Sequence, residues 1–152
     1  MNATEPLQLR PGSRLARGVA RALRALDFVS VEEMVPEPGL RVDLMALGPK
    51  GQVWVIECKS GAVDFRADQK WRNYLGFCDR FFWAVDADFP VGLLPGGTGL
   101  ILADAYDAEI IRMGDETLLA APRRKALLHR FARHAATRLH NVRDPVFTTR
   151  VG

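Results

Sequence analysis

Three side chains of this sequence, Asp43, Glu57 and Lys59, have the types and spacing for metal-dependent chemistry. Glu57 and Lys59 interrupt the apolar, β-branched run 53–59, which is typical of a buried strand. Because side chains alternate along a strand, both are expected on one face. A buried carboxylate or ammonium costs free energy unless it has a partner, so this pair indicates a site. A plain structural ion pair between Glu57 and Lys59 is the alternative.

Carboxylate oxygens are the ligands that Mg²⁺ and Mn²⁺ prefer, so Asp43 and Glu57 are the predicted metal ligands. The backbone carbonyl of Cys58 is a candidate third ligand. A metal bound there would lower the pKa of a coordinated water and stabilise negative charge on a phosphate. Lys59 would orient that water or neutralise the developing charge, because a protonated lysine cannot itself ligate the metal.

Whether Asp43 and Glu57 meet depends on the turn between their predicted strands, 40–47 and 52–59. The two carboxylates share a face only if paired residue numbers add to an even sum. A connection of three or five residues, or a bulge, satisfies that condition, whereas two or four residues do not. The glycine-flanked turn at 48–51 therefore predicts one of the odd-length connections or a bulge.

The rest of the pattern predicts an α/β fold around this strand pair. The expected elements, in order, are a helix over 13–26, strands over 28–35, 40–47 and 52–59, a helix over 65–78, a strand over 81–85, a hairpin of 100–103 and 109–113, and a helix over 122–140. The first three strands should form an antiparallel meander, and the fourth should run parallel to the third after a helix crossover. We expect flexible tails over 1–12 and 146–152 around a single domain, 13–145.

The predicted first helix has two distinct faces. One face carries an apolar core stripe that includes Leu15, Val19, Leu23 and Leu26. Another face carries four arginines, Arg14, Arg17, Arg21 and Arg24. The arginine stripe predicts DNA phosphate contacts along a groove, with a solvated face as the alternative.

A second basic group, Arg123, Arg124 and Lys125, opens the predicted last helix, where the macrodipole disfavours cations. A bound DNA phosphate and a nearby acidic group of the same protein explain this placement equally well. Residues 121–152 hold eight basic residues and one acid, against eight basic and twelve acidic residues over 41–120. This asymmetry suits a protein that holds a cation centrally and contacts a polyanion at its edges.

Composition places the chain among ordinary globular proteins. Its 152 residues are 48% hydrophobic and 26% charged, with a net charge of +3. No apolar run is long enough to cross a bilayer, and the first residues lack the pattern of a secretion signal. A cytoplasmic protein without a membrane partner is therefore predicted. The two cysteines, Cys58 and Cys78, are expected to be reduced thiols.

Several runs of the sequence resemble the MmcB-like DNA repair family. They are 41–47, 56–60, 64–71, 78–81, 99–104 and 123–133, together with Tyr74. Asp43 followed by Glu57, Cys58 and Lys59 is similar to the central motif of the PD-(D/E)xK nuclease superfamily. The resemblance implies a restriction-endonuclease-like core of helix, three-stranded antiparallel meander, helix and parallel strand, here with an added hairpin and C-terminal helix.

The resemblance also implies a role in DNA repair, with Mg²⁺ or Mn²⁺ as cofactor and hydrolysis of DNA phosphodiesters as the reaction. Related nucleases place a Gln or Lys of the second helix beside the scissile phosphate, which makes Gln69 and Lys70 catalytic candidates. Some relatives add a metal-binding glutamate from the first helix. This chain has arginines there, and Glu32 or Glu33 is the substitute.

Two alternatives remain open at this stage. A non-catalytic DNA-binding or adaptor protein of a repair complex would keep the fold without turnover. On the second helix, an ion pair of Asp68 with Arg72, one turn further on, is the structural alternative to a role in catalysis. The partners besides DNA are repair-complex proteins or a second copy of the chain.

Overall fold

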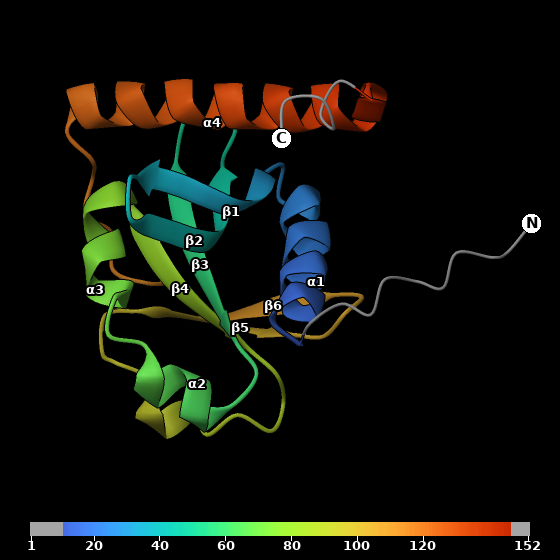
Figure 1. The fold of residues 1–152 in the computed structure, drawn as a ribbon. Coiled ribbons are helices and arrows are strands. Elements are labelled where there is room, and N and C mark those ends of the chain that lie inside the picture. The colour runs from blue at the N-terminus through green and yellow to red at the C-terminus, as the bar shows by residue number, and fades with distance from the viewer. Residues whose placement is uncertain (1–10, 147–152) are drawn as a thin grey trace, which may run out of the picture.

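The structure, a computed structural model, describes residues 11–146 and contains one mixed six-stranded sheet (Figure 1). Strands β1 (Val29–Glu37), β2 (Leu40–Leu47) and β3 (Val53–Lys59) form an antiparallel meander. Strands β4 (Arg80–Val85) and β5 (Gly99–Ala103) continue the sheet in parallel, and β6 (Ala108–Arg112) returns antiparallel. The predicted meander, the parallel fourth strand and the hairpin are confirmed.

Helices cover both faces and one end of this sheet (Figure 1). Helix α1 (Pro11–Ala25) packs on one face. The other face is covered by α2 (Ala62–Ala67), α3 (Trp71–Tyr74) and a 3₁₀ turn, η1 (Leu75–Phe77). Helix α4 (Ala121–Arg143) crosses the end at which β3 and β4 begin, and η2 (Val91–Leu93) lies in the loop after β4. Among the described residues, none of the helices is both long and apolar enough to span a membrane.

The side chains of β3 alternate between two separate hydrophobic clusters. Val53 and Val55 belong to the cluster on the α3 side, whereas Trp54, Ile56 and Cys58 belong to the cluster under α1. The alternation follows directly from the pleat of a strand. It places Glu57 and Lys59 on one face, as predicted, and the structure shows that this is the α3 side.

Helix α1 buries most of its predicted stripe. Leu15, Val19 and Leu23 are at most 4% exposed, but Leu26 is 51% exposed because the helix ends at Ala25. The helix also begins at residue 11, two residues earlier than predicted, so the expected tail 1–12 is wrong at its end. The remainder of both predicted tails, apart from residue 146, lies outside the described residues.

The single helix predicted over 65–78 is wrong. The segment is broken into α2, α3 and η1, with residues 68–70 in none of them. The Asp68 carboxylate accepts the backbone N–H groups of Lys70 and Trp71, at 2.9 and 3.1 Å. An aspartate that captures these donors competes with the helical hydrogen-bond ladder and ends it.

Helix α4 is also longer than predicted, and only some of its apolar side chains are buried. Leu127 and Phe131 are buried, whereas Leu139 is 63% exposed. His134, on the same helix, is half-buried. Burial and the neighbouring Arg138 lower the pKa of His134.

Candidate active site

The connection between β2 and β3 has the length that the site requires. Leu47 pairs with Val53 and Leu44 with Ile56, so five residues connect the strands and paired numbers add to an even sum. The predicted odd-length connection is confirmed. In this register Asp43 lies opposite Glu57, on the same face of the sheet.

Each of the two carboxylates accepts a backbone N–H from the strand that carries the other. The Asp43 backbone N–H donates to Glu57 Oε1, and the Cys58 backbone N–H donates to Asp43 Oδ2, both at 2.8 Å. These bonds take the place of ladder hydrogen bonds at the end of the strand pair. Each carboxylate is therefore held by one oxygen in a fixed orientation, at the point where the strands separate.

Strand β1, on the other side of β2, has an unusual backbone conformation at the same level. Glu32 pairs with Leu44 and Met34 pairs with Val42, which leaves Glu33 opposite Asp43. Glu33 has a φ of 52°, in the left-handed region that residues other than glycine seldom adopt. Such local strain often accompanies functional sites.

Burial dominates the electrostatics of the acidic pair. Glu57 is 4% exposed and Asp43 is half-buried. Burial, with a further contribution from the Asp43 charge, raises the pKa of Glu57 to about 8. Burial also raises the pKa of Asp43 above its usual value. A cation bound between the two carboxylates would stabilise their charged forms.

Lys59 is held at the wall of the site by Asp68. Its ammonium lies 2.9 Å from Asp68 Oδ2, and the two side chains are 14% and 9% exposed. The alternative ion pair of Asp68 with Arg72 is therefore wrong. Arg72 instead places its guanidinium carbon 4.6 Å from the centre of the Trp71 ring.

These groups line one cleft of about 740 Å³ at the carboxyl end of β3. The cleft brings together every predicted catalytic and metal-site residue: Asp43, Glu57, Cys58, Lys59, Gln69 and Lys70. Glu32, Glu33, Arg41 and Tyr74 line it as well. The side chain of Cys58 turns away into the cluster under α1, so only its backbone faces this site.

The donor set fits a divalent cation that keeps part of its water shell. Within residues 11–146, no three His, Cys, Asp or Glu side chains form a group that could hold a metal. Asp43 and Glu57 supply two carboxylates, which is the usual protein contribution to Mg²⁺. Water and a substrate phosphate normally complete its coordination.

The arginine stripe begins beside the cleft. Gly12, Ser13 and Ala16 of α1 line the cleft, so the start of this helix forms part of its rim. Three arginines of the stripe are exposed, namely Arg14, Arg21 and Arg24. The fourth, Arg17, is half-buried. The stripe that was predicted to contact DNA phosphates therefore starts at the rim of the cleft.

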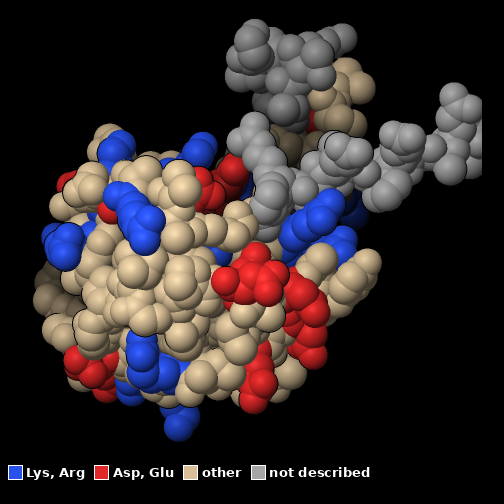
Figure 2. Space-filling view, turned by 90° about the horizontal axis from the view of Figure 1, so that it is seen from below, with Lys and Arg blue, Asp and Glu red and all other residues tan. Residues whose placement is uncertain are grey.

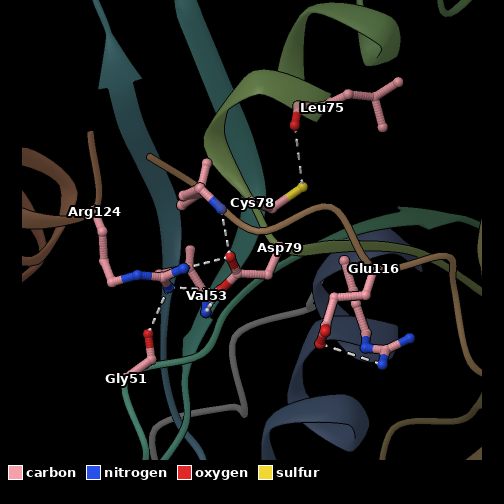
Figure 3. Close-up of polar contacts among 9 residues, drawn as sticks. Gly51, Val53, Leu75, Cys78, Asp79, Glu116 and Arg124 are labelled. Atoms are coloured by element: carbon pink, nitrogen blue, oxygen red, sulfur yellow. Dashed lines mark hydrogen bonds and ion pairs between the residues drawn. The ribbon is translucent and has the colours of Figure 1, made fainter. Parts of the chain in front are cut away.

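The basic group on α4 lies at the opposite end of the sheet. Arg124 forms a two-bonded ion pair with Asp79, each N–O distance being 2.7 Å, and also donates to the Gly51 carbonyl (Figure 3). Arg123 lies over the ring of Phe77, at 4.5 Å from its centre, and Lys125 is exposed. The acidic group of the same protein, and not a phosphate, accounts for Arg124 at the start of the helix.

Asp79 is a structural residue that the sequence reasoning missed. Its carboxylate also accepts the backbone N–H of Val53 at 2.8 Å (Figure 3) and that of Leu119 at 2.9 Å. Burial alone would raise the pKa of Asp79, but the hydrogen bonds from Arg124 and the two amides outweigh burial and lower it. An acid at the start of the apolar run 81–85 was the available signal.

Comparison with known proteins gives one family and one closely similar structure. A family described as DNA repair protein MmcB-like matches residues 5–146. A solved structure of a protein of unknown function from Silicibacter pomeroyi is 65% identical, with a TM-score of 0.89, and the match covers 91% of this chain and 95% of that one. Among curated proteins no match is found.

Proposed function

This chain belongs to the MmcB-like DNA repair family, and we propose that it is a nuclease that hydrolyses DNA phosphodiesters with Mg²⁺ or Mn²⁺. The proposal includes a place in the PD-(D/E)xK superfamily. The observation that carries it is the pair Asp43 and Glu57, two carboxylates that line the cleft, have raised pKa values and each accept a backbone N–H from the other's strand. Perturbed acids gathered in a cleft are typical of functional sites.

The residues of the cleft have separable roles. Asp43 and Glu57 would hold the cation, with the Cys58 carbonyl as a further oxygen ligand. When bound, the cation supplies an acidic water and neutralises charge at a phosphate. Lys59, fixed by Asp68, would donate hydrogen bonds to the attacking water or to a phosphate oxygen. Gln69 and Lys70 are exposed at the rim and would bind the DNA backbone beside the scissile phosphate.

The direct test is cleavage of DNA in Mg²⁺ or Mn²⁺. Supercoiled, linear and branched DNA should be cut by the native protein, and Asp43→Asn and Lys59→Ala should abolish cutting. The matched control is Lys50→Ala, which removes an exposed lysine from the β2–β3 turn, remote from the cleft. Cutting that survives Asp43→Asn would refute the assignment.

A non-catalytic DNA-binding role is the second candidate, and one observation favours it. The ammonium of Lys59 is already neutralised by Asp68 at 2.9 Å. A lysine held in this way has less charge to offer a phosphate. This candidate predicts salt-sensitive DNA binding that Arg21→Gln weakens, with no cutting in either metal. Arg124 is unsuitable for this assay because its ion pair with the buried Asp79 stabilises the fold.

A further inference from the structure

An exposed tyrosine lies against the arginine stripe of α1. Tyr106 is 70% exposed in the loop between β5 and β6. The guanidinium carbons of Arg17 and Arg21 lie 5.2 and 5.9 Å from the centre of its ring. Both distances are within the range of cation–π contacts. The contacts hold the ring at the surface while most of its area stays open to solvent.

Hydrogen bonds fix the loop that carries this ring. Arg17 Nε donates to the Ala105 carbonyl at 2.6 Å. The Asp104 carboxylate accepts the backbone N–H groups of Tyr106 and Asp107, at 2.7 and 2.9 Å. Acidic and basic side chains adjoin on the face seen in Figure 2. Because Asp104 is engaged within its own loop, it stabilises the position of the ring.

The stripe connects Tyr106 with the cleft. Ala16 lines the cleft, and Arg17, the next residue, contacts the ring. Helix α1 therefore borders the cleft with its first turns and the ring with its next ones. No arginine of α1 forms a salt bridge with any residue among 11–146. Their charges remain available to phosphates.

Building on the proposed function, we propose that a single-stranded segment of the DNA substrate leaves the cleft along α1 and stacks an unpaired base on Tyr106. Its phosphates would contact the stripe, in particular Arg14 and Arg21. Bases in a duplex already stack on each other, so an open aromatic ring beside a basic track suits a single strand. The substrate class is therefore DNA with an unpaired stretch, as in a gap, a flap or a frayed end.

The test is DNA binding measured by fluorescence anisotropy in EDTA, where no metal-dependent cutting occurs. The probes are a labelled oligothymidine of about 15 nucleotides and a duplex of the same length. Tyr106→Ala should weaken single-strand binding about fivefold or more, and Tyr106→Phe, which keeps the ring, should restore it. Leu118→Ala is the control, since Leu118 is also 70% exposed but lies before α4.

Salt dependence separates stacking from charge. Arg21→Gln should reduce the slope of log affinity against log salt by about 0.7 for a single strand, whereas Tyr106→Ala should leave the slope unchanged. Equal losses on single strand and duplex, or native single-strand affinity in a folded Tyr106→Ala protein, would overturn the proposal. Tyr106-dependent binding by a protein that cuts no DNA would support this site while removing the nuclease. Cutting of DNA by a protein whose single-strand binding does not depend on Tyr106 would support the nuclease and refute the Tyr106 site.

Discussion

Replacing Arg124 by methionine tests whether this arginine at the start of α4 stabilises the fold or binds DNA. The substitution removes the guanidinium but keeps a long side chain. In the native protein this guanidinium joins the start of α4 to Asp79 and to the Gly51 carbonyl (Figure 3). The Asp79 carboxylate would keep only its two backbone donors, Val53 and Leu119. A buried carboxylate that has lost its cation destabilises the fold.

The expected loss can be worked out from the burial of the pair. The Asp79 side chain is 2% exposed and that of Arg124 is 25% exposed. Removing one partner of a buried ion pair costs about 3–5 kcal/mol. Because the arginine is partly solvated and two amides remain on Asp79, we expect the lower end, about 3 kcal/mol. For a chain of this size the Tm should fall by roughly 6–12 °C.

Thermal unfolding measured by circular dichroism at pH 7 is the assay, with Arg123→Met as the matched control. Arg123 only lies over the ring of Phe77, so its loss should cost less than about 1 kcal/mol. Combining Asp79→Asn with Arg124→Met should recover part of the loss. An unchanged Tm together with weakened DNA binding would refute the structural role and favour a phosphate contact.

The pH dependence has a defined sign. The folded pKa of Asp79 lies below its usual value of 3.8. Stability from this group is therefore present above about pH 3.8 and is lost as pH falls through the lower folded pKa. The difference in Tm between the native protein and Arg124→Met should be full at pH 7 and shrink in acid.

Three further predictions concern the cleft and α1. Glu57→Gln should stabilise the metal-free protein by about 3 kcal/mol at pH 7, because the folded pKa of about 8 lies above the usual value of 4.5 and ionisation opposes folding in between. The same change should abolish any rise in Tm caused by Mn²⁺, and a native-sized rise would count against the metal site. Asp68→Ala should cost about 1 kcal/mol more than Asp68→Asn in urea unfolding, since only the asparagine can still accept the amides that end the helix. Gly18→Ala should lower stability by about 1–3 kcal/mol, because its added methyl group meets the backbone carbonyls of Asp104 and Asp107, and a native Tm would contradict this close packing.

The geometry of the acidic pair was accessible from local pattern alone. Strand periodicity assigned Glu57 and Lys59 to one face, and the parity of the turn decided whether Asp43 would join them. Both inferences depend only on residues close in sequence. They were confirmed because a strand pair with a short connection has few registers available.

The features that escaped prediction depend on partners distant in sequence. Asp68 breaks the predicted helix, yet its local spacing equally suits an ion pair with Arg72. Its contact with Lys59 comes from the fold of the whole segment. Arg124 and Asp79 are 45 positions apart, and Tyr106 gains its significance only from the arginines of α1. Tertiary context decides each of these cases, and no periodicity records it.

The thin attachment of α2 has a consequence for access to the cleft. None of its six residues is buried, and Phe65, edge-on to Trp83 at 5.1 Å, is its main anchor. Releasing one partly buried phenyl ring costs about 1–2 kcal/mol, far less than unfolding the domain. We therefore expect α2 to open locally while the sheet stays folded, so that amide exchange is much faster over 62–67 than in β3. Because Asp64 and Ala67 line the cleft, such an opening would widen it for the proposed DNA substrate with an unpaired stretch.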